Sequence, residues 1–584
     1  MTDKKKPLTA GGQIGADQGR RRIIKGFAAS SLLPLLGGNL LGCAGTGNSS
    51  SAQDSPVEAS FLHGVASGDP LENRVIIWTR ATPSAADTVN LRWEVATDDA
   101  FTDVVASGQG STSAAVDYTA KVDVDGLMPG AQYFYRFFAG DTASPVGRTQ
   151  TLPTSGVEAV RFAVLSCSNY PAGFFNVYRE VANADVDAVL HLGDYIYEYG
   201  ADGYATSRAA EFGRVPEPAN EILSLNDYRL RYGQYRGDVD LQAAHAAHPF
   251  IVVWDDHEIT NDAWREGAQN HQPDTEGDYR ARVTAALQAY YEWMPIRPPA
   301  EDREIIYRQF KYGDLVDLLM LDTRLVGRDQ QVSYADYNSE AGFDLESAMA
   351  AIADSDRTLL GDAQNAWLEE RLNASTATWQ ALGQQLLMGR YTLPVSAIVS
   401  LDYRNLDVER GRAAVVATAQ AKATPESQRT PEQQQLVASL VPYNTDAWDG
   451  YGFNQGSLMS TAHSTGSRLV AFAGDTHNAW ASELSDRDGN VVGVEFATAS
   501  VSSPGIDGRV SPEMAVELEA PFLTLMDGLH YVNLRDRGYL AVEFTEQAVT
   551  ARWRYVSTID SRDYAMLEDR AHDITVPADN LKLS

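Results

Sequence analysis

The sequence predicts an all-β module followed by a larger α/β domain, both preceded by an N-terminal leader. Residues 61–153 hold alternating polar and apolar runs separated by turn residues, the pattern of half-buried antiparallel strands. From residue 159 onward, short apolar runs alternate with helical patterns, which is typical of sheets flanked by helices. Several of these runs end just before Asp or Cys, at the position where α/β sheets carry functional side chains.

Length and charge agree with a folded protein of more than one unit. The 584 residues exceed one ordinary core, and the 44% hydrophobic content is normal for globular proteins. The formal net charge of −32 disfavours nucleic acid and anionic membranes, so no nucleic-acid partner is expected. The same charge opposes a phosphate ligand at long range, and bound cations would reverse that field locally.

Residues 1–43 are predicted to be an export signal of the lipoprotein type. Arg20 and Arg21 begin a twin-arginine pattern, so the twin-arginine (Tat) export machinery is an expected partner. The apolar stretch 27–41 is shorter than the ~20 residues of a membrane span and is broken by Pro and Gly. Leu40-Leu41-Gly42-Cys43 resembles a lipobox, which predicts lipidation of Cys43 and membrane contact by that lipid anchor only. Ordinary cleavage that discards Cys43 is the alternative, and the expected location is the periplasm or cell surface.

The β module is assigned to residues 60–153, after a flexible linker rich in Ser and Gly at 44–59. Residues 126–136 resemble the corner between two strands of a fibronectin type III sandwich, with Leu-x-Pro followed by Tyr-x-Tyr. We therefore expect a fibronectin type III/Ig-like sandwich that serves as a scaffold. A carbohydrate-binding or surface-binding unit is the alternative.

The α/β region contains several apolar strand patterns and three clear helical patterns. Strands are expected at 161–165, 189–192, 250–254, 379–383 and 469–473. Helices are expected at 174–183, 278–293 and 362–372, the last with Asp near its start and Arg near its end, as the helix dipole prefers. The polar stretch 420–440, with two Thr-Pro steps, is predicted to be a surface excursion.

Four of these strands end in residues that bind metals. Cys167 follows the first strand, Asp194 the second, Asp256-His257 the third and Asp475-Thr476-His477 the last. Strand ends of this kind build the sites of α/β sheets, so these side chains are expected to form one metal site for hard to borderline cations. If Cys43 is acylated or removed, Cys167 is the sole thiol, which favours a ligand role; a buried apolar thiol is the alternative.

Six motifs carry a resemblance to a known family: Ser166-Cys167-Ser168-Asn169, Gly193 to Glu198, Trp254 to Asp262, Leu321 to Arg324, Asp446 to Tyr451 and Gly474 to His477. Together they resemble the PhoD-type alkaline phosphatases of the calcineurin-like metallophosphoesterase and purple acid phosphatase group, over nearly the whole chain after the leader. The Asp-x-His motif of the wider group is absent, and Cys167 stands in its place, as in the PhoD-type branch. The resemblance implies an α/β metallophosphoesterase fold of two mixed sheets flanked by helices across 157–560, with a C-terminal tail at 561–584.

Two adjacent cations can supply what phosphoester hydrolysis needs: a hydroxide, neutralised phosphoryl oxygens and a stabilised leaving oxygen. Asp194 is the expected bridging carboxylate and is therefore also assigned a catalytic role. Tyr197 binds as phenolate only to a strong Lewis acid, because its free pKa is about 10. Fe(3+) is therefore favoured, with Cys167 and His477 completing its shell. The expected oxygen donors to a second, hard ion, which the resemblance implies is Ca(2+), are Asp256, Asn261 and Asp475.

Further residues are assigned roles around the phosphate. His257 matches the family histidine that faces the phosphate, which implies that it protonates the leaving group or holds a phosphoryl oxygen; a structural histidine is the alternative. Arg324 is predicted to clamp phosphate, with a structural salt bridge as the alternative. Asp255 is expected to support Asp256. Core or supporting positions are expected for Tyr195, Glu198 and Tyr199.

The function predicted from these residues is that of an exported, lipid-tethered alkaline phosphatase. It would hydrolyse phosphate monoesters, with diesters as a further substrate class, and release inorganic phosphate by attack of a metal-activated hydroxide at an iron and calcium site. A phospholipase D-like phosphodiesterase on the same site is the alternative. A surface-binding β-sandwich protein with an inactive hydrolase domain is the hypothesis from a different class, and the intact ligand set disfavours it. A monomer is expected.

Overall fold

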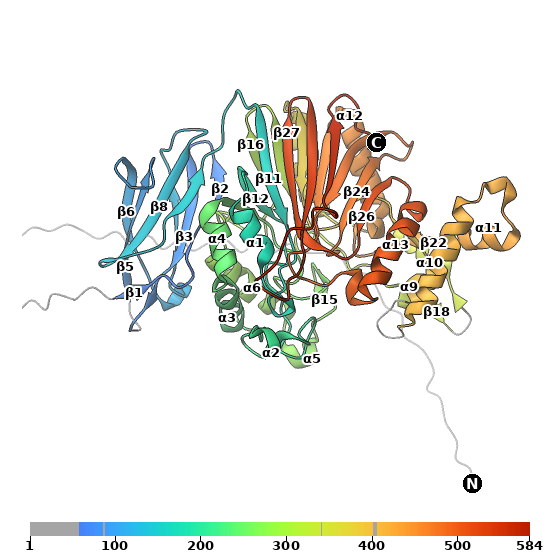
Figure 1. The fold of residues 1–584 in the computed structure, drawn as a ribbon, viewed down its shortest axis with the longest axis horizontal. Coiled ribbons are helices and arrows are strands. Elements are labelled where there is room, and N and C mark those ends of the chain that lie inside the picture. Colours follow the sequence, from blue (N-terminus) through green and yellow to red (C-terminus); the bar gives the residue numbers. More distant parts are fainter. Residues whose placement is uncertain (1–57, 86–87, 340–341, 401–405, 584) are drawn as a thin grey trace, which may run out of the picture. The chain divides into compact units, whose positions relative to one another are not determined.

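One nine-stranded sheet runs through both predicted regions of the chain (Figure 1). The computed structural model describes residues 58–85, 88–339, 342–400 and 406–583, so the predicted leader and nearly all of the predicted linker lie outside the described residues. The sheet order is β29-β28-β27-β11-β12-β13-β2-β3-β7. Its strands are β2 (Val65–Leu71), β3 (Arg74–Arg80), β7 (Thr119–Val124), β11 (Ala159–Leu165), β12 (Ala188–His191), β13 (Pro249–Val252), β27 (Arg537–Thr545), β28 (Ala548–Val556) and β29 (His572–Pro577).

The centre of this sheet is parallel and apolar. β11 pairs with β12 and β12 with β13 in parallel, and nearly every residue of the three strands is buried. Strands buried on both faces are near-continuous apolar runs, which is why the sequence pattern located them. β27 pairs with the other edge of β11 in the antiparallel direction, so the sheet is mixed, as predicted.

A second mixed sheet of seven strands packs against the first. Its order is β16-β17-β20-β23-β25-β24-β26, and the aromatic ring of Phe544 on β27 lies 6.0 Å from Trp379 and 6.2 Å from Phe472. The Trp379 indole also donates to the Thr545 carbonyl at 2.7 Å. The core therefore lies between the two sheets. The strands are β16 (Arg308–Tyr312), β17 (Val316–Met320), β20 (Trp379–Gly383), β23 (Leu469–Ala473), β24 (Ala479–Ser485), β25 (Val491–Ala497) and β26 (Leu529–Asn533).

The N-terminal all-β region forms a sandwich that shares the nine-stranded sheet. Its outer sheet has the order β10-β8-β5-β6, built from β5 (Val89–Ala96), β6 (Val104–Thr112), β8 (Gln132–Ala139) and β10 (Gly147–Gln150). β2 pairs directly with β13, so this region extends the sheet of the α/β domain. Gly68 is required there, because a Cβ atom would lie 2.1 Å from the Pro295 carbonyl oxygen. In the predicted corner, the Met128 amide donates to the Tyr133 hydroxyl at 2.8 Å.

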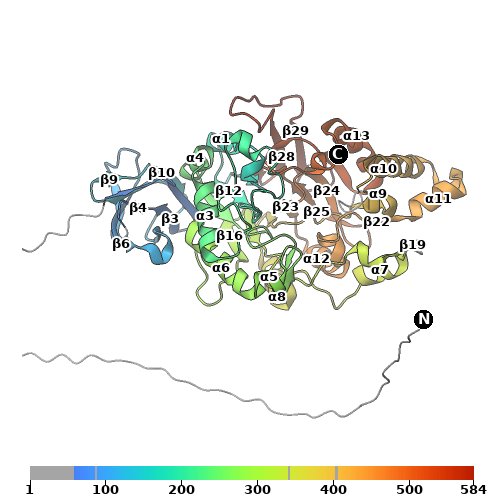
Figure 2. The ribbon, with the colours of Figure 1, turned by 90° about the horizontal axis from the view of Figure 1, so that it is seen from below.

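Helices flank the two sheets, and the three predicted ones are present with small shifts at their ends. They are α1 (Asn176–Ala182), α6 (Tyr279–Trp293) and α8 (Gly361–Ala374). Asp278 caps α6 by accepting the Ala281 amide at 2.9 Å. The predicted surface excursion holds the end of α10 (Val408–Ala423) and α11 (Pro431–Ala438); α10 packs on α13 (Pro512–Leu525) (Figure 2). The remaining longer helices are α3 (Leu225–Arg236), α4 (Val239–Ala247), α7 (Leu345–Ile352) and α12 (Gly452–Thr465).

The C-terminal segment takes part in the sheet. Residues 572–577, within the segment assigned to a tail, form β29 and pair with β28. A helix with the length and apolarity needed to cross a bilayer is absent from the described ranges.

Candidate metal centre

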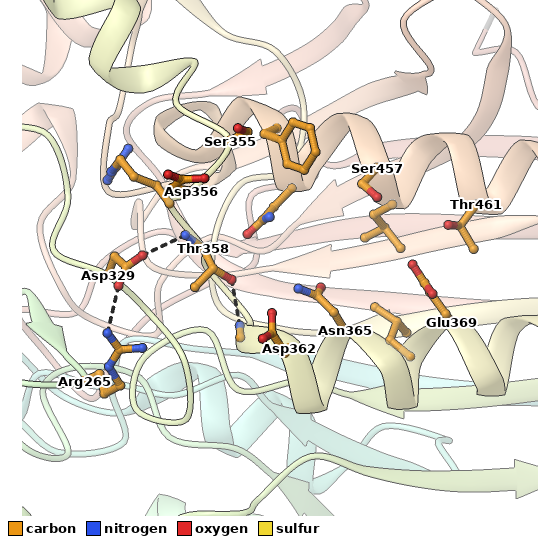
Figure 3. Close-up of a pocket in the computed structure, with 16 residues that line it drawn as sticks. Arg265, Asp329, Ser355, Asp356, Thr358, Asp362, Asn365, Glu369, Ser457 and Thr461 are labelled. Atoms are coloured by element: carbon orange, nitrogen blue, oxygen red, sulfur yellow. Dashed lines mark hydrogen bonds and ion pairs between the residues drawn. The ribbon is translucent and has the colours of Figure 1, made fainter. Parts of the chain in front are cut away.

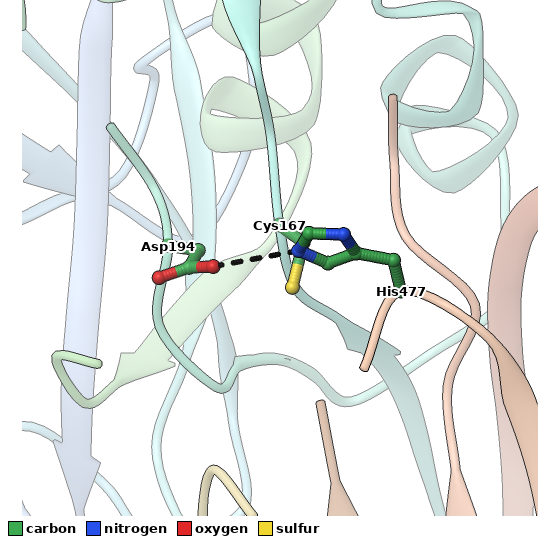
Figure 4. Close-up of side chains that lie close together, drawn as sticks. All are labelled: Cys167, Asp194 and His477. Carbon is green, nitrogen blue, oxygen red and sulfur yellow. Dashed lines mark ion pairs between the residues drawn. The ribbon is translucent and has the colours of Figure 1, made fainter. Parts of the chain in front are cut away.

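Side chains from three strand ends converge at one place between the two sheets. Cys167 follows β11, Asp194 follows β12 and His477 follows β23, and Figure 4 shows the three side chains together. One potential ligand atom from each lies within 4.8 Å of the others. Cys167 and Asp194 are buried, and His477 is slightly exposed. The arrangement is compact enough for one cation.

Two further groups adjoin the first and share residues with it. Asp194, Asp256 and His257 form the second group, and Asp255, Asp256 and Asp475 form the third, each within the same 4.8 Å limit. Asp194 thus belongs to the first and second groups, and Asp256 to the second and third. All the Asp, His and Cys residues assigned to metal or catalysis from the sequence lie in these groups.

Tyr197 lies in the same cluster. Its hydroxyl is 2.9 Å from Asp194 Oδ2 and 3.1 Å from His477 Nε2, and Ser503 Oγ donates to it at 2.6 Å. Burial, followed by the nearby Asp194 and Cys167, raises the pKa of Tyr197 well above its ordinary value. Without a cation this phenol therefore stays protonated, and a strong Lewis acid would be needed to bind it as phenolate.

The backbone at these strand ends adopts a conformation that side chains other than Gly rarely take. The φ angles are 62° at Cys167, 55° at Asp194, 60° at Asp475 and 65° at His477. Such angles cost free energy and concentrate at functional sites, where tight turns direct side chains into the site. Gly193 precedes one of these turns with φ 102°, and a Cβ atom there would lie 2.3 Å from that of Asp255.

His477 is oriented by a backbone carbonyl. Its Nδ1 lies 2.7 Å from the Pro504 oxygen, which can only accept, so Nδ1 carries the proton. In the neutral imidazole Nε2 is then the nitrogen with a free lone pair, and it faces Tyr197 and Asp194. Histidines that bind metals are commonly held in this tautomer by such a contact.

His257 forms a buried pair with Glu198. Nδ1 of His257 is 2.6 Å from Glu198 Oε2. Burial opposes the charged imidazolium, but the charge of Glu198, with smaller contributions from Asp194 and Asp256, raises the pKa of His257 well above its ordinary value. In the metal-free chain His257 is therefore a proton donor that Glu198 orients.

Glu258 anchors the site, and the sequence reasoning missed its role. Its carboxylate accepts the backbone amides of Asp194 at 2.9 Å, Tyr195 at 2.6 Å and Asp255 at 2.8 Å. One buried side chain thus ties the strand end after β12 to the one after β13. Its place in the Asp-Asp-His-Glu string was the only available signal.

The predicted phosphate clamp at Arg324 does not fit the geometry. This side chain has no exposed surface, and its nitrogens face Asp255 at 2.5 Å, Asp446 at 2.8 Å and Asp475 at 2.9 Å. Because its nitrogens face these carboxylates, Arg324 neutralises their charge. This agrees with the alternative given above, a structural salt bridge. Asn261 donates from its side-chain Nδ2 to Gln269 at 3.0 Å, and this contact leaves its Oδ1, the atom that would bind a cation, unused.

The donor set fits cations. Asp194 Oδ1 and Asp255 Oδ2 are buried, and neither has a hydrogen-bond partner within the described residues. A buried, unpaired carboxylate oxygen is costly, and a bound cation removes that cost. Thiolate, phenolate and imidazole suit a Lewis-acidic transition metal, whereas the carboxylates suit a hard ion.

A pocket of about 420 Å³ between α8 and α12 is a separate feature (Figure 3). Two of its charged groups pair with neighbours: Arg265 contacts Asp329 at 3.0 Å, and Asp329 accepts the Thr358 amide at 2.9 Å. The pocket is lined by residues from outside the ligand groups described above.

The layered α/β fold, with candidate metal ligands at its strand ends, is that of a phosphoric ester hydrolase. More narrowly, the chain belongs to the PhoD-like phosphatase family: the family model matches residues 162–553, and the model of the family's N-terminal domain matches 47–153. The chain is 34% identical over 464 residues to alkaline phosphatase D of Bacillus subtilis (strain 168), covering 76% of this chain and 70% of that protein. A solved structure of PhoD matches with a TM-score of 0.72 and 30% identity, covering 91% of this chain and 93% of the other. The resemblance stated from the sequence is thus confirmed.

Proposed function

We propose that this chain is a two-metal phosphatase that hydrolyses phosphate monoesters, and also diesters, at the cluster around Asp194. The observation that carries the proposal is that Asp194 belongs to two adjacent ligand groups, one with Cys167 and His477, the other with Asp256 and His257. A carboxylate between two cation positions suits in-line displacement at phosphorus, because both the attacking and the leaving oxygen need positive charge. Membership of the family supports this reaction type.

The ligands divide by chemistry into two sets. Fe(3+) is proposed at Cys167, Asp194, Tyr197 and His477, and Ca(2+) at Asp194, Asp256 and Asp475. When bound, the cations would supply Lewis acidity to the phosphoryl oxygens and to a water molecule. Asn261 is proposed as a further oxygen donor to the Ca(2+), because its contacts with Glu198 and Gln269 use its backbone amide and Nδ2 and leave Oδ1 for the ion.

Proton transfer is proposed for His257. Glu198 accepts from Nδ1, so the Nε2–H of the imidazolium is left to donate to a phosphoryl or leaving oxygen. Arg324 acts in the proposal through Asp255, Asp446 and Asp475, whose carboxylates it holds in place, rather than by contact with substrate.

The leader extends the proposal to export and lipid anchoring. Arg20→Lys combined with Arg21→Lys should block export, whereas Cys43→Ser should leave the enzyme exported but released from the membrane. Cell fractionation reads out both variants. Finding the Cys43→Ser protein in the membrane fraction would refute the lipid anchor and leave the export signal standing.

Metal analysis combined with ester hydrolysis tests the proposed reaction. Asp194→Asn should lose about 100-fold or more in kcat/KM for a monoester, together with bound metal. The matched control is Asp317→Asn, a buried β17 carboxylate that accepts from Ser375 outside the cluster, and it should keep both. Near wild-type turnover by Asp194→Asn would place the active site elsewhere. The ratio of monoester to diester turnover separates the phosphatase from a phospholipase D-like phosphodiesterase.

A further inference from the structure

Two partly exposed tyrosine rings stand beside the histidines of the cluster. The ring of Tyr199 is 5.5 Å from that of His257, and the ring of Tyr204 is 6.3 Å from that of His477 at an interplanar angle of 28°. The two tyrosine rings are 5.9 Å apart. Both side chains are only partly buried, in contrast to the fully buried Tyr197 behind them. They form an aromatic wall at the site, and the proposed reaction gives it no role.

The wall is held in place before any ligand arrives. The Tyr204 hydroxyl donates to the Pro504 carbonyl at 2.5 Å, the same oxygen that orients His477. The chain packs closely behind Tyr199, since a Cβ atom on Gly203 would lie 2.6 Å from the Tyr199 Cβ. A preorganised ring loses little conformational entropy when a ligand stacks on it.

A flat ring placed against these two tyrosines would gain stacking and apolar contact.

We propose that Tyr199 and Tyr204 bind the leaving group of the substrate and that they favour esters whose leaving group carries a flat ring, such as nucleoside or aryl phosphates. This inference rests on the proposed function, in which His257 faces the reacting phosphoryl group. Tyr199, next to His257, contacts the leaving group first, and Tyr204 extends the wall toward His477.

The test compares adenosine 5′-phosphate with glycerol 3-phosphate, because both leave as alkyl alcohols and differ chiefly in the flat ring. Wild-type enzyme should show the higher kcat/KM for adenosine 5′-phosphate. Tyr199→Ala and Tyr199→Leu should each reduce that preference by about two- to tenfold, the size of an aromatic pair. Tyr199→Phe keeps the ring and should keep the preference. Bound metal is measured in each variant, so that a damaged cluster is recognised.

The outcomes separate this inference from the proposed function. If the wild-type enzyme hydrolyses neither ester, the proposed function fails. If it hydrolyses both with equal kcat/KM, or if Tyr199→Ala and Tyr199→Leu lower both equally, the tyrosines only cover the cluster and the inference is overturned. Competitive inhibition by free adenosine that weakens in Tyr199→Ala, at unchanged inhibition by inorganic phosphate, would support the stacking contact independently of turnover.

Discussion

Replacing Glu258 by Gln tests how strongly one buried carboxylate holds the site together. In the wild type, Oε2 accepts the amides of Asp194 and Asp255, and Oε1 accepts that of Tyr195. Glutamine can keep its oxygen at the first position, but its NH2 group then faces the Tyr195 amide, donor against donor. Burial raises the pKa of Glu258 to about 8, so the mismatch at the Tyr195 amide, and not a lost charge, is the expected cause of the effect.

The expected loss of stability follows from the number of backbone amides that Gln leaves without an acceptor. One buried amide without an acceptor costs about 1–3 kcal/mol of unfolding free energy. Because Asp194 has φ 55° and its amide is one of the three, loosening this anchor should also displace the shared ligand. Loss of a contact that orients a metal ligand typically costs about 10–100-fold in metal affinity.

Glu495→Gln is the matched control. Glu495 is also fully buried, and it accepts the amides of Met388 and Gly389 and the Tyr391 hydroxyl, none of them in the cluster. Urea unfolding of chelator-treated protein should show a similar loss of stability in both variants. Metal titration should show weaker binding only in Glu258→Gln. Equal metal affinity in the two variants would refute the anchoring role of Glu258.

Three further predictions concern β12, the strand that precedes Asp194, the turn at Gly193, and Tyr197, whose hydroxyl contacts Asp194. Burial lowers the pKa of His191 to about 3, so wild-type stability should fall as pH drops below about 6.5, by about 2 kcal/mol at pH 5. In urea unfolding, His191→Gln should remove that part of the fall. An unchanged dependence of stability on pH in His191→Gln would contradict this assignment. Gly193→Ala should destabilise by about 2–4 kcal/mol, since its Cβ would overlap Asp255 at a φ of 102°, and wild-type stability would show that the turn relaxes freely. Purified protein should be coloured by phenolate bound to ferric iron, chelation should remove calcium and activity before the colour, and added calcium should restore activity better than zinc. Tyr197→Phe should lose or shift the visible band, and a colourless, iron-free, fully active enzyme would exclude iron.

The strand ends were predictable, and the contacts among them were not. Asp194 and Asp475 follow apolar runs that end in Gly, and this pattern locates both the strands and the site. The burial of Arg324 depends on Asp446, which lies on a distant loop, so a local pattern of charge could not decide between a phosphate clamp and an ion pair. Glu258 accepts from backbone amides, which every residue except Pro possesses, and such contacts leave no pattern in the sequence. The pairing of β2 with β13 is equally invisible, because strand periodicity reports which faces are buried but not which strand is the neighbour.

The order of strands in the nine-stranded sheet has a consequence for how the chain is made. Cys167 follows β11, and one of the two neighbours of β11 is β27. During synthesis, Val164 on β11 therefore cannot pair with Leu540 until nearly the whole chain has been made. Until then a mostly apolar strand presents an open edge, which is a template for aggregation, and pairing over such a separation is slow. A premature stop after the last ligand, His477, would therefore leave every proposed metal ligand in the polypeptide and still remove the strand that closes the sheet beside Cys167. Such a product should be degraded or aggregated, because it would also lack Ser503, Pro504 and the amides of residues 500–502, which bond the carbonyls of His477, Ser166 and Cys167.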